Sequence, residues 1–228
     1  MLNKKELIDL IFNEDNAYLT DFQNHKVFNS ILSDVLYLEE DLRQNNLELH
    51  ILSAYRSFNS QQSIWNQKVL GQRDVLDERS KKIDIRNLTN EELFFKILNW
   101  SAFPTLSRHH FGTELDIADG IYLQENPRYQ CQMIDSEYLT GPFKNLFQYT
   151  KSNLKNFYHP YQKDLGGIKP EPWHISNNIS KEIISDFTYE IFLDFLNSDL
   201  LKDILLLDIA KKNSKLLYHQ YFLPRLNV

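Results

Sequence analysis

Apolar residues recur at intervals of three to four along much of the chain, and this spacing places them on one face of a helix. The pattern predicts helices at residues 4–13, 27–43 and 142–154. Towards the C-terminus, one apolar helix face starts at Ser180, and a second helix follows residues 197–199. These last segments predict a helical extension after the central part of the chain.

Polar residues with the spacing of helix caps stand before two further segments. Asn59 resembles the first residue of a capping box and predicts a helix over about residues 60–72. Thr89 starts a second such box, for a helix that passes through Trp100. Pro104 ends this helix, because the residue before a proline disfavours helical backbone.

Strands are expected where apolar and polar residues alternate. Residues 47–55 and 115–122 have this pattern. Within residues 157–175, two short extended pieces around Gly166-Gly167 predict a hairpin. The mixture predicts an α+β fold, in which a small antiparallel sheet carries the functional site and helices flank it.

Composition fits a globular protein with one sizeable core. The chain has 228 residues, of which 42% are hydrophobic, and its net charge is −6. The basic residues are scattered, so charge gives no support for nucleic-acid binding. Cys131 is the one cysteine, which excludes a disulfide within the chain, and its neighbours offer no base that would activate the thiol.

The N-terminus begins with two lysines and a short apolar stretch. Glu6 and Asp9 interrupt that stretch, so an amphipathic helix is expected there and not a signal peptide. No run approaches the ~18–20 apolar residues that span a membrane. As written, the chain is expected to be soluble and cytoplasmic. A periplasmic or secreted location stays open for a chain that has been trimmed.

Two histidines and an aspartate have the residue types that bind a catalytic zinc ion. Such an ion takes three protein ligands and leaves one position for water. His109 and Asp116 are seven residues apart, and Gly112 between them lets the chain turn so that both can reach one ion. His174 would supply the third ligand from another strand. The pattern predicts a zinc site at His109, Asp116 and His174.

Glu171 is the candidate general base, because a carboxylate near zinc can take a proton from water. It precedes His174 by three residues, so an irregularity near Pro172 is needed to bring both side chains to one place. His110 lies outside the register in which His109 serves, and it is expected to support the site or to face substrate. Structural roles are expected for the other histidines, which are His25, His50, His159 and His219.

Three motifs together resemble the LAS-type zinc metallopeptidases, and most closely their VanY-like D-alanyl-D-alanine carboxypeptidase branch. The motifs are Ser-x-Tyr-Arg-Ser at 53–57, Ser-x-His-x-x-Gly-x-x-x-Asp at 107–116 and Glu-x-Trp-His at 171–174. The resemblance covers about residues 47–176. It implies a metallopeptidase core at 47–176, with an N-terminal helical segment at 1–46 packed on it and a C-terminal helical extension at 177–228.

The resemblance also implies roles for the site residues. It assigns the three metal ligands, for a single zinc ion, and the base to the residues already named. It implies that Arg56 faces the substrate and the developing oxyanion, and that Ser107 and Gln61 contribute to substrate binding, with Ser107 supporting the metal loop. Glu114 departs from the family, which usually has a small residue there, and is expected either to face away or to alter substrate preference.

The implied reaction is hydrolysis of a peptide bond in a peptidoglycan stem peptide, most simply removal of a C-terminal D-alanine by a D,D- or L,D-carboxypeptidase. Two alternatives stay open: an endopeptidase of the phage-lysin type, and a zinc-containing binding domain without turnover. The expected partner is a peptidoglycan-derived peptide. The protein itself is expected to be a monomer, or a dimer through its C-terminal helices.

Overall fold

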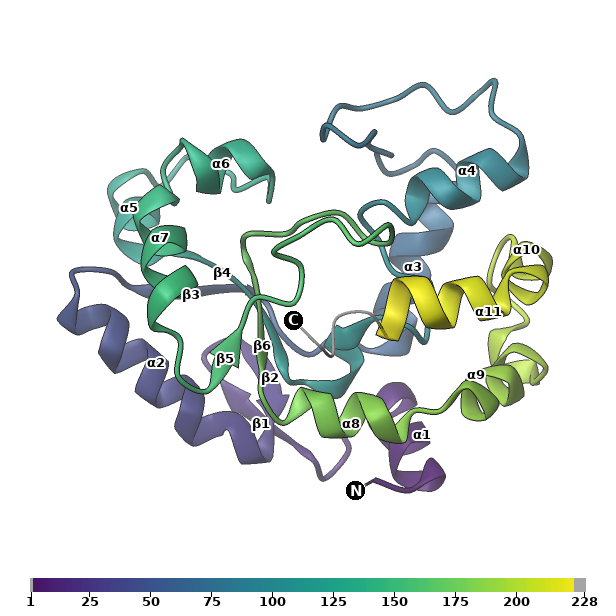
Figure 1. The fold of residues 1–228 in the computed structure, drawn as a ribbon, viewed down its shortest axis with the longest axis horizontal. Coiled ribbons are helices and arrows are strands. Elements are labelled where there is room, and N and C mark those ends of the chain that lie inside the picture. The colour runs from purple at the N-terminus through teal and green to yellow at the C-terminus, as the bar shows by residue number, and fades with distance from the viewer. Residues whose placement is uncertain (1, 224–228) are drawn as a thin grey trace.

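The centre of the protein is a four-stranded antiparallel sheet (Figure 1). The computed structural model describes residues 2–223. The strands lie in the order β3 (Leu49–Ser53), β4 (Glu114–Asp119), β6 (His174–Asn177) and β5 (Phe157–Tyr158). A separate hairpin pairs β1 (Leu19–Phe22) with β2 (His25–Phe28). The sheet and the helices around it confirm the predicted α+β class.

Helices surround this sheet. In Figure 1, α3 and α4 lie on the same side of the molecule as α9, α10 and α11, whereas α5, α6 and α7 lie together on the other side. The α-helices are Lys4–Phe12 (α1), Leu32–Gln44 (α2), Phe58–Val69 (α3), Asn90–Ile97 (α4), Gly120–Glu125 (α5), Asp135–Leu139 (α6), Lys144–Asn153 (α7), Ser180–Asp186 (α8), Tyr189–Leu196 (α9), Leu207–Lys212 (α10) and Ser214–Leu216 (α11). The 3₁₀ turns are Asn29–Ile31 (η1), Arg108–Phe111 (η2) and Asp199–Leu201 (η3), and a π-helical segment spans Leu217–Phe222 (η4). None of the helices between residues 2 and 223 is long and apolar enough to cross a membrane.

One hydrophobic core draws side chains from the N-terminal, central and C-terminal parts of the chain. Its members include Leu7, Leu10, Val35, Leu38, Ile51, Trp65, Leu115, Ile117, Ile175, Phe192, Phe195 and Phe222. Leu115 and Ile117 face this core from β4, and their strand neighbours therefore face the opposite side of the sheet. Burial of one face of β4 thus fixes which residues are left to form the functional site.

Hydrogen bonds join the C-terminal helices to α3. The indole Nε1 of Trp65 donates to the carbonyl of Leu205 at 2.9 Å. The side chain of Asn66 donates to the carbonyl of Asp203 and accepts from the backbone N–H of Leu205. Phe192 and Phe222 are also buried in the shared core, so the C-terminal helices pack on the central part of the chain. Dimerisation through these helices stays a prediction, and residues 224–228 lie outside the described residues.

The N-terminal segment differs from the prediction, because it is not wholly helical. Val27 and Phe28 lie in β2, paired with β1, and the helix expected from residue 27 begins as α2 at Leu32. In the sequence, Val27 and Ile31 have the same apolar spacing as the residues of α2. In the structure, however, Ile31 reaches the core from the η1 turn directly before that helix. The strand pairing of Val27 with Thr20 overrides that spacing.

Helix starts and ends also differ in detail. Thr89 caps α4 with a full capping box as predicted, but α4 ends at Ile97, before Trp100. The cap of α3 is Ser57, whose hydroxyl accepts from the backbone N–H of Ser60, and not Asn59. Asn59 already lies inside the helix, so Ser57 is the residue whose side chain satisfies a free backbone N–H at the start of α3.

The C-terminal apolar faces are broken into shorter helices. Thr188 interrupts the first face and caps α9, since its hydroxyl accepts from the backbone N–H of Ile191. The second face is split between η3 and α10, and Leu206 between them has a positive φ of 62°. Apolar spacing alone cannot reveal these breaks, because both sides of each break contribute to the same core.

The expected strands are confirmed in shorter form. β4 ends at Asp119, whose carboxylate accepts from the N–H of Ile121 and starts α5 before Tyr122. β5 pairs with β6 in antiparallel register, but its partners are Ser176 and Asn177, so the second strand lies later than predicted and no tight hairpin forms at the two glycines. The long connection between β5 and β6 contains Gly166 and Gly167.

Gly112 is the residue at which the N-terminal hairpin meets the loop after η2. It has a positive φ of 67°, and a Cβ there would lie 2.9 Å from both the Leu19 side chain and the backbone nitrogen of Phe28. Its carbonyl accepts from the Phe28 N–H at 2.8 Å. The close backbone approach therefore requires glycine.

Replacing Gly112 by alanine should destabilise the protein more than the matched change Gly71→Ala. Both glycines have positive φ, but a Cβ on Gly71 meets only the flexible end of Ile85, at 3.2 Å. Gly71→Ala should lower the free energy of unfolding by about 1–2 kcal/mol. Gly112→Ala should lower the free energy of unfolding by a further ~1–3 kcal/mol, because its Cβ would clash with backbone. Denaturant unfolding measures both, and equal losses would contradict the close approach.

Candidate metal centre

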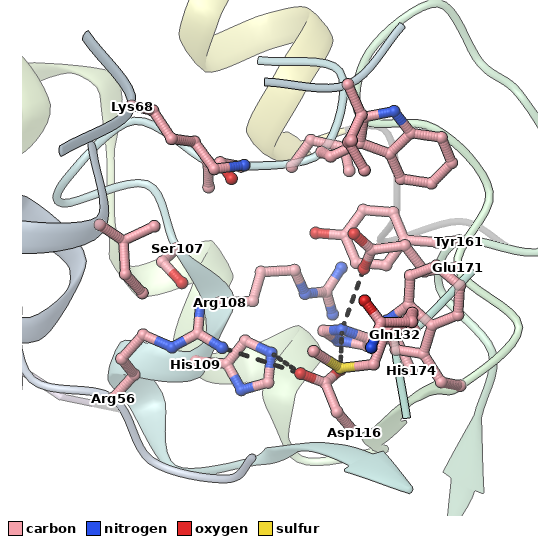
Figure 2. A pocket seen from close by; sticks show the side chains of 18 of the residues that line it. Arg56, Lys68, Ser107, Arg108, His109, Asp116, Gln132, Tyr161, Glu171 and His174 are labelled. Atoms are coloured by element: carbon pink, nitrogen blue, oxygen red, sulfur yellow. Dashed lines mark ion pairs between the residues drawn. The ribbon is translucent and has the colours of Figure 1, made fainter. Parts of the chain in front are cut away.

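The structure brings the three predicted metal ligands together. His109 comes from η2, Asp116 from β4 and His174 from β6. His109 Nε2 lies 3.3 Å from Asp116 Oδ2, and His174 Nδ1 lies 3.2 Å from Asp116 Oδ1. One ligand-type atom from each residue lies within 4.8 Å of the others, and all three residues are buried (Figure 2). They form one compact cluster in the wall of a pocket.

Strand register explains the position of two of these residues. In the antiparallel pair of β4 and β6, Asp116 lies directly opposite His174, and Glu114 lies directly opposite Ser176. Opposed residues project from the same face of a sheet, as do residues two apart on one strand. His174 is therefore held between two carboxylates, Asp116 in front and Glu114 behind it.

Hydrogen bonds determine which ring nitrogen each histidine presents to the cluster. His109 uses Nδ1 to donate to the carbonyl of Ala54 at 2.7 Å, which leaves the lone pair of Nε2 free. His174 uses Nε2 to donate to Glu114 Oε2 at 2.7 Å, which leaves Nδ1 free.

Two buried atoms of the cluster have no hydrogen-bond partner: His174 Nδ1 and Asp116 Oδ1. Buried polar atoms are rarely left in this state, and a cation would satisfy both. Two imidazole nitrogens and one carboxylate oxygen, with room for a water, form the donor set that catalytic zinc takes. The residues at this site therefore fit a zinc ion.

Glu114 contacts His174 directly, and the sequence left its position open. It is fully buried, it does not face away, and it does not line the pocket. Besides His174, it accepts from the Ser176 hydroxyl at 2.6 Å, and it pairs with Arg108 at 3.4 Å. The spacing of Glu114 and Asp116 within one strand could have revealed that both share a face.

The charges around His174 and its burial shift the pKa of its imidazole in opposite directions. Burial lowers the pKa of His174, but the carboxylates of Asp116, Glu114 and Glu171 outweigh it and hold the pKa well above its usual range. Burial would raise the pKa of Asp116, yet the neighbouring His109 and His174 hold it well below its usual range. Protons therefore compete with a metal ion for His174, so metal binding at this site is coupled to pH.

Glu171 reaches the cluster through a turn. The backbone N–H of His174 donates to the carbonyl of Glu171 at 3.1 Å, which closes a tight turn through Pro172. This is the irregularity that the spacing of three required. Glu171 Oε2 lies 3.3 Å from His174 Nδ1, and its side chain is 12% exposed. The carboxylate is thus beside the cluster and in contact with the pocket.

Arg56 approaches the cluster from the other side. Its Nη2 lies 3.7 Å from Asp116 Oδ2 and also donates to the Ser53 hydroxyl at 2.8 Å. Its Nη1 donates to Gln61 Oε1 at 3.0 Å, and Gln61 Nε2 donates to the carbonyl of Ala102. Gln61 is buried behind Arg56 and does not line the pocket, so the structure places it as a support for Arg56.

Ser107 and His110 occupy different environments. Ser107 lines the pocket, as its predicted role requires. His110 is fully buried, its Nδ1 donates to the carbonyl of Arg56 at 2.6 Å, and its Nε2 accepts from the N–H of Thr105. Both of its ring nitrogens are used within the protein, so His110 supports the loop that carries His109.

The cluster lies in a cavity of about 200 Å³. Figure 2 shows Asp116 and His174 at one end and Lys68 across the cavity from them. The indole rings of Trp100 and Trp173, which both line the cavity, stack with centroids 6.2 Å apart. The cavity therefore combines an acidic metal-type end, an aromatic wall and a basic wall.

The family model for the D-alanyl-D-alanine carboxypeptidase VanY matches residues 24–178. The match covers more than half of the chain, and this protein therefore belongs to the VanY D-alanyl-D-alanine carboxypeptidase family. The metallocarboxypeptidase family predicted from the three motifs is confirmed. An uncharacterised protein of Haemophilus influenzae is 32% identical over 91 residues, which span 40% of this chain and 62% of that relative.

Solved structures share the fold. The VanY D,D-pentapeptidase of a VanB-type resistance cassette, in complex with Zn(II), is 19% identical with a TM-score of 0.50, over 76% of this chain and 86% of its own. VanYB in complex with D-alanine-D-alanine is 18% identical with a TM-score of 0.51, over 84% and 98%. The LD-carboxypeptidase LdcB is 13% identical with a TM-score of 0.52, over 97% and 89%.

Buried, neutral His110 should make the metal-free protein less stable as the pH falls. Burial lowers the pKa of His110 from 6.5 to about 3, so the unfolded chain binds a proton that the folded chain excludes. Above pH 6.5, His110 is neutral in both states and does not reduce the free energy of unfolding. As the pH falls from 6.5 towards 3, the free energy of unfolding decreases by up to about 1.4 kcal/mol per pH unit.

Unfolding with a chelator present, at pH values from 7 to 4.5, measures this slope. The variant His110→Gln should show a slope smaller by about one proton. Equal slopes for the variant and the natural protein would show that His110 does not contribute.

Proposed function

We propose that this protein is a zinc-dependent carboxypeptidase that removes a C-terminal D-alanine from a peptidoglycan stem peptide. The observation that carries the proposal is the buried cluster of His109, Asp116 and His174 with Glu171 beside it, in a chain of the VanY family. Relatives with this fold were solved with Zn(II) and with D-alanine-D-alanine, which supports the metal and the substrate class.

His109 Nε2, Asp116 and His174 Nδ1 would hold one zinc ion. The two hydrogen-bonded ring nitrogens point away from the cluster, so the nitrogens that remain are oriented for metal before it binds. Zinc, when bound, supplies Lewis acidity towards a water and a carbonyl oxygen. The chain's own contribution is a buried set of ligands whose imidazole rings are already oriented by hydrogen bonds.

Glu171 would act as the general base and then as the general acid. Its carboxylate lies beside the cluster and opens to the cavity, so it can take a proton from the attacking water. The same carboxyl group can then pass that proton to the leaving amine. Both transfers need only the reach of one side chain.

Arg56 would stabilise the oxyanion that develops on the carbonyl under attack. Its guanidinium is 3.7 Å from Asp116, and Ser53 and Gln61 hold it in that position. A donor fixed before the reaction favours the charge of the transition state over that of the substrate. Ser107, at the wall of the cavity, would contact the bound peptide.

The variant Glu171→Ala should keep zinc and lose turnover. Purified protein loaded with zinc should release D-alanine from a short peptide that ends in D-Ala-D-Ala, and a chelator should stop the release. Because Glu171 moves the protons and holds no metal, its removal should lower kcat by about 10²–10⁴-fold. Exposed Glu125 offers a control, since Glu125→Ala should behave as the natural protein.

Metal content and the initial rate of D-alanine release are the two measurements. A fully active Glu171→Ala protein would sink the assignment of the base. A natural protein that binds zinc but releases no D-alanine would favour a binding domain. Equal rates on free and C-terminally amidated peptides would favour an endopeptidase.

Removing the charge of Glu114 should weaken zinc binding. Glu114 orients His174 and raises its basicity as a ligand, so Glu114→Gln should lower zinc affinity by about 10–100-fold. The same change leaves Arg108 buried without its carboxylate, which should cost about 3–5 kcal/mol of stability. Competition with a chelator measures the affinity, and unfolding of the metal-free protein measures the stability.

The double variant Arg108→Met with Glu114→Gln separates the two effects. It removes both buried charges, so stability should return while zinc affinity stays low. A double variant with the natural affinity for zinc would mean that Glu114 acts only by stabilising the fold.

A further inference from the structure

Lys68 lies in the last turn of α3 and lines the same cavity as the metal cluster. It is only 8% exposed, which is unusual for a lysine. Figure 2 shows its ammonium directed into the cavity, across from Asp116 and His174. None of the proposed catalytic steps uses this group.

The ammonium of Lys68 has no ion-pair partner within the part of the chain that the structure describes. It makes no hydrogen bond and no ion pair with residues 2–223. The carboxylate of Asp74, next along the chain, pairs instead with Lys82 at 2.7 Å. An ammonium that lines a cavity without an ion pair makes this end of the cavity positive, so it favours an anion.

Further cations surround Lys68. Arg73 and Arg56 line the same cavity. Burial lowers the pKa of Lys68 to about 8, and Arg73 and Arg56 act in the same direction, while Glu171 opposes them. Arg56 belongs to the acidic end, since it lies 3.7 Å from Asp116, whereas Lys68 and Arg73 form the basic wall of the cavity.

We infer that Lys68, flanked by Arg73, forms a subsite that binds a carboxylate of the peptide substrate, at a distance from the residues that carry out the hydrolysis. The inference rests on the proposed function, since a peptide in this cavity brings carboxylates as its anionic groups. Two sources offer that chemistry in a stem peptide: the terminal carboxylate of the leaving residue, and the free carboxylate of the D-glutamate residue.

The subsite makes recognition depend on charge. A carboxylate beside Lys68 gains a charge-assisted hydrogen bond in a site that is largely shielded from water. An amide in its place leaves the ammonium without an ion pair, so the protein should discriminate between the acid and its amide. The discrimination should act on peptide binding, because Lys68 is not placed to move protons at the scissile bond.

Peptide binding to a zinc-loaded protein that cannot cleave provides the test. In a Glu171→Ala background, calorimetry would give Kd for three peptides: L-Ala-γ-D-Glu-L-Lys-D-Ala-D-Ala, its C-terminal amide, and its analogue with D-isoglutamine. Lys68→Met keeps the length of the side chain and removes its charge. Lys68→Arg restores a charge, and Lys144→Met removes an exposed lysine from α7 as a control.

We expect Lys68→Met to weaken binding of the parent peptide by about 10–100-fold, the range for a hydrogen bond to a charged group. It should weaken one of the two amides much less, and that amide identifies the carboxylate that Lys68 binds. Lys68→Arg should recover most of the affinity, and Lys144→Met should match the Glu171→Ala protein.

Three results would overturn the subsite: unchanged binding of the parent peptide by Lys68→Met, an equal loss for all three peptides, or no measurable binding of the parent peptide before Lys68 is changed. Failure of the proposed function would look different, since it requires that the natural enzyme release no D-alanine. D-Alanine release together with unchanged binding by Lys68→Met would remove the subsite alone.

Discussion

The pairing of β4 with β6 is the constraint on which the rest of the site depends. It places Asp116 opposite His174 and Glu114 opposite Ser176, so one strand supplies both the carboxylate that faces the cavity and the one behind the imidazole. A shift of either strand by one residue would turn its two polar side chains into the apolar core. Leu115, Ile117 and Ile175 prevent that shift, because they are buried there already.

The buried pair of Arg108 and Glu114 is a consequence of the same register. A carboxylate behind His174 orients the ring, but its charge must be balanced in a site without water. Arg108 balances it, and its Nη2 also donates to the hydroxyls of Tyr158 and Ser176. Orientation of a ligand and satisfaction of a buried charge are thus achieved by one network, which ties η2 to β4, β5 and β6.

The cavity joins two electrostatic environments that meet the substrate separately. Asp116, Glu171 and Arg56 surround the position of the proposed metal, whereas Lys68 comes from α3 and Arg73 from the loop after it. In the proposed mode of binding, a peptide places the carbonyl of its scissile bond at the acidic end and one of its free carboxylates at the basic wall. Binding and chemistry then rely on different residues of one cavity.

The sequence by itself determined the family and the class of fold, and it predicted the metal-type cluster. His109, Asp116, His174 and Glu171 could be chosen because catalytic zinc demands few residue types, and the glycine spacing selected one histidine of two. The alternation of apolar and polar residues located most strands, and apolar residues at helical spacing located most helices. Both patterns arise because one face of each element is buried.

Only the tertiary structure decided the rest, because it depends on contacts between distant segments. The strand at Val27, the breaks after Asp186 and at Leu206, and the position of Gln61 behind Arg56 follow from pairing and packing that local spacing does not record. The same holds for Glu114 and Lys68. Each is an ordinary charged residue in the sequence. Its role follows from the tertiary structure, which places His174 and Arg108 beside Glu114 and gives Lys68 no ion-pair partner among residues 2–223.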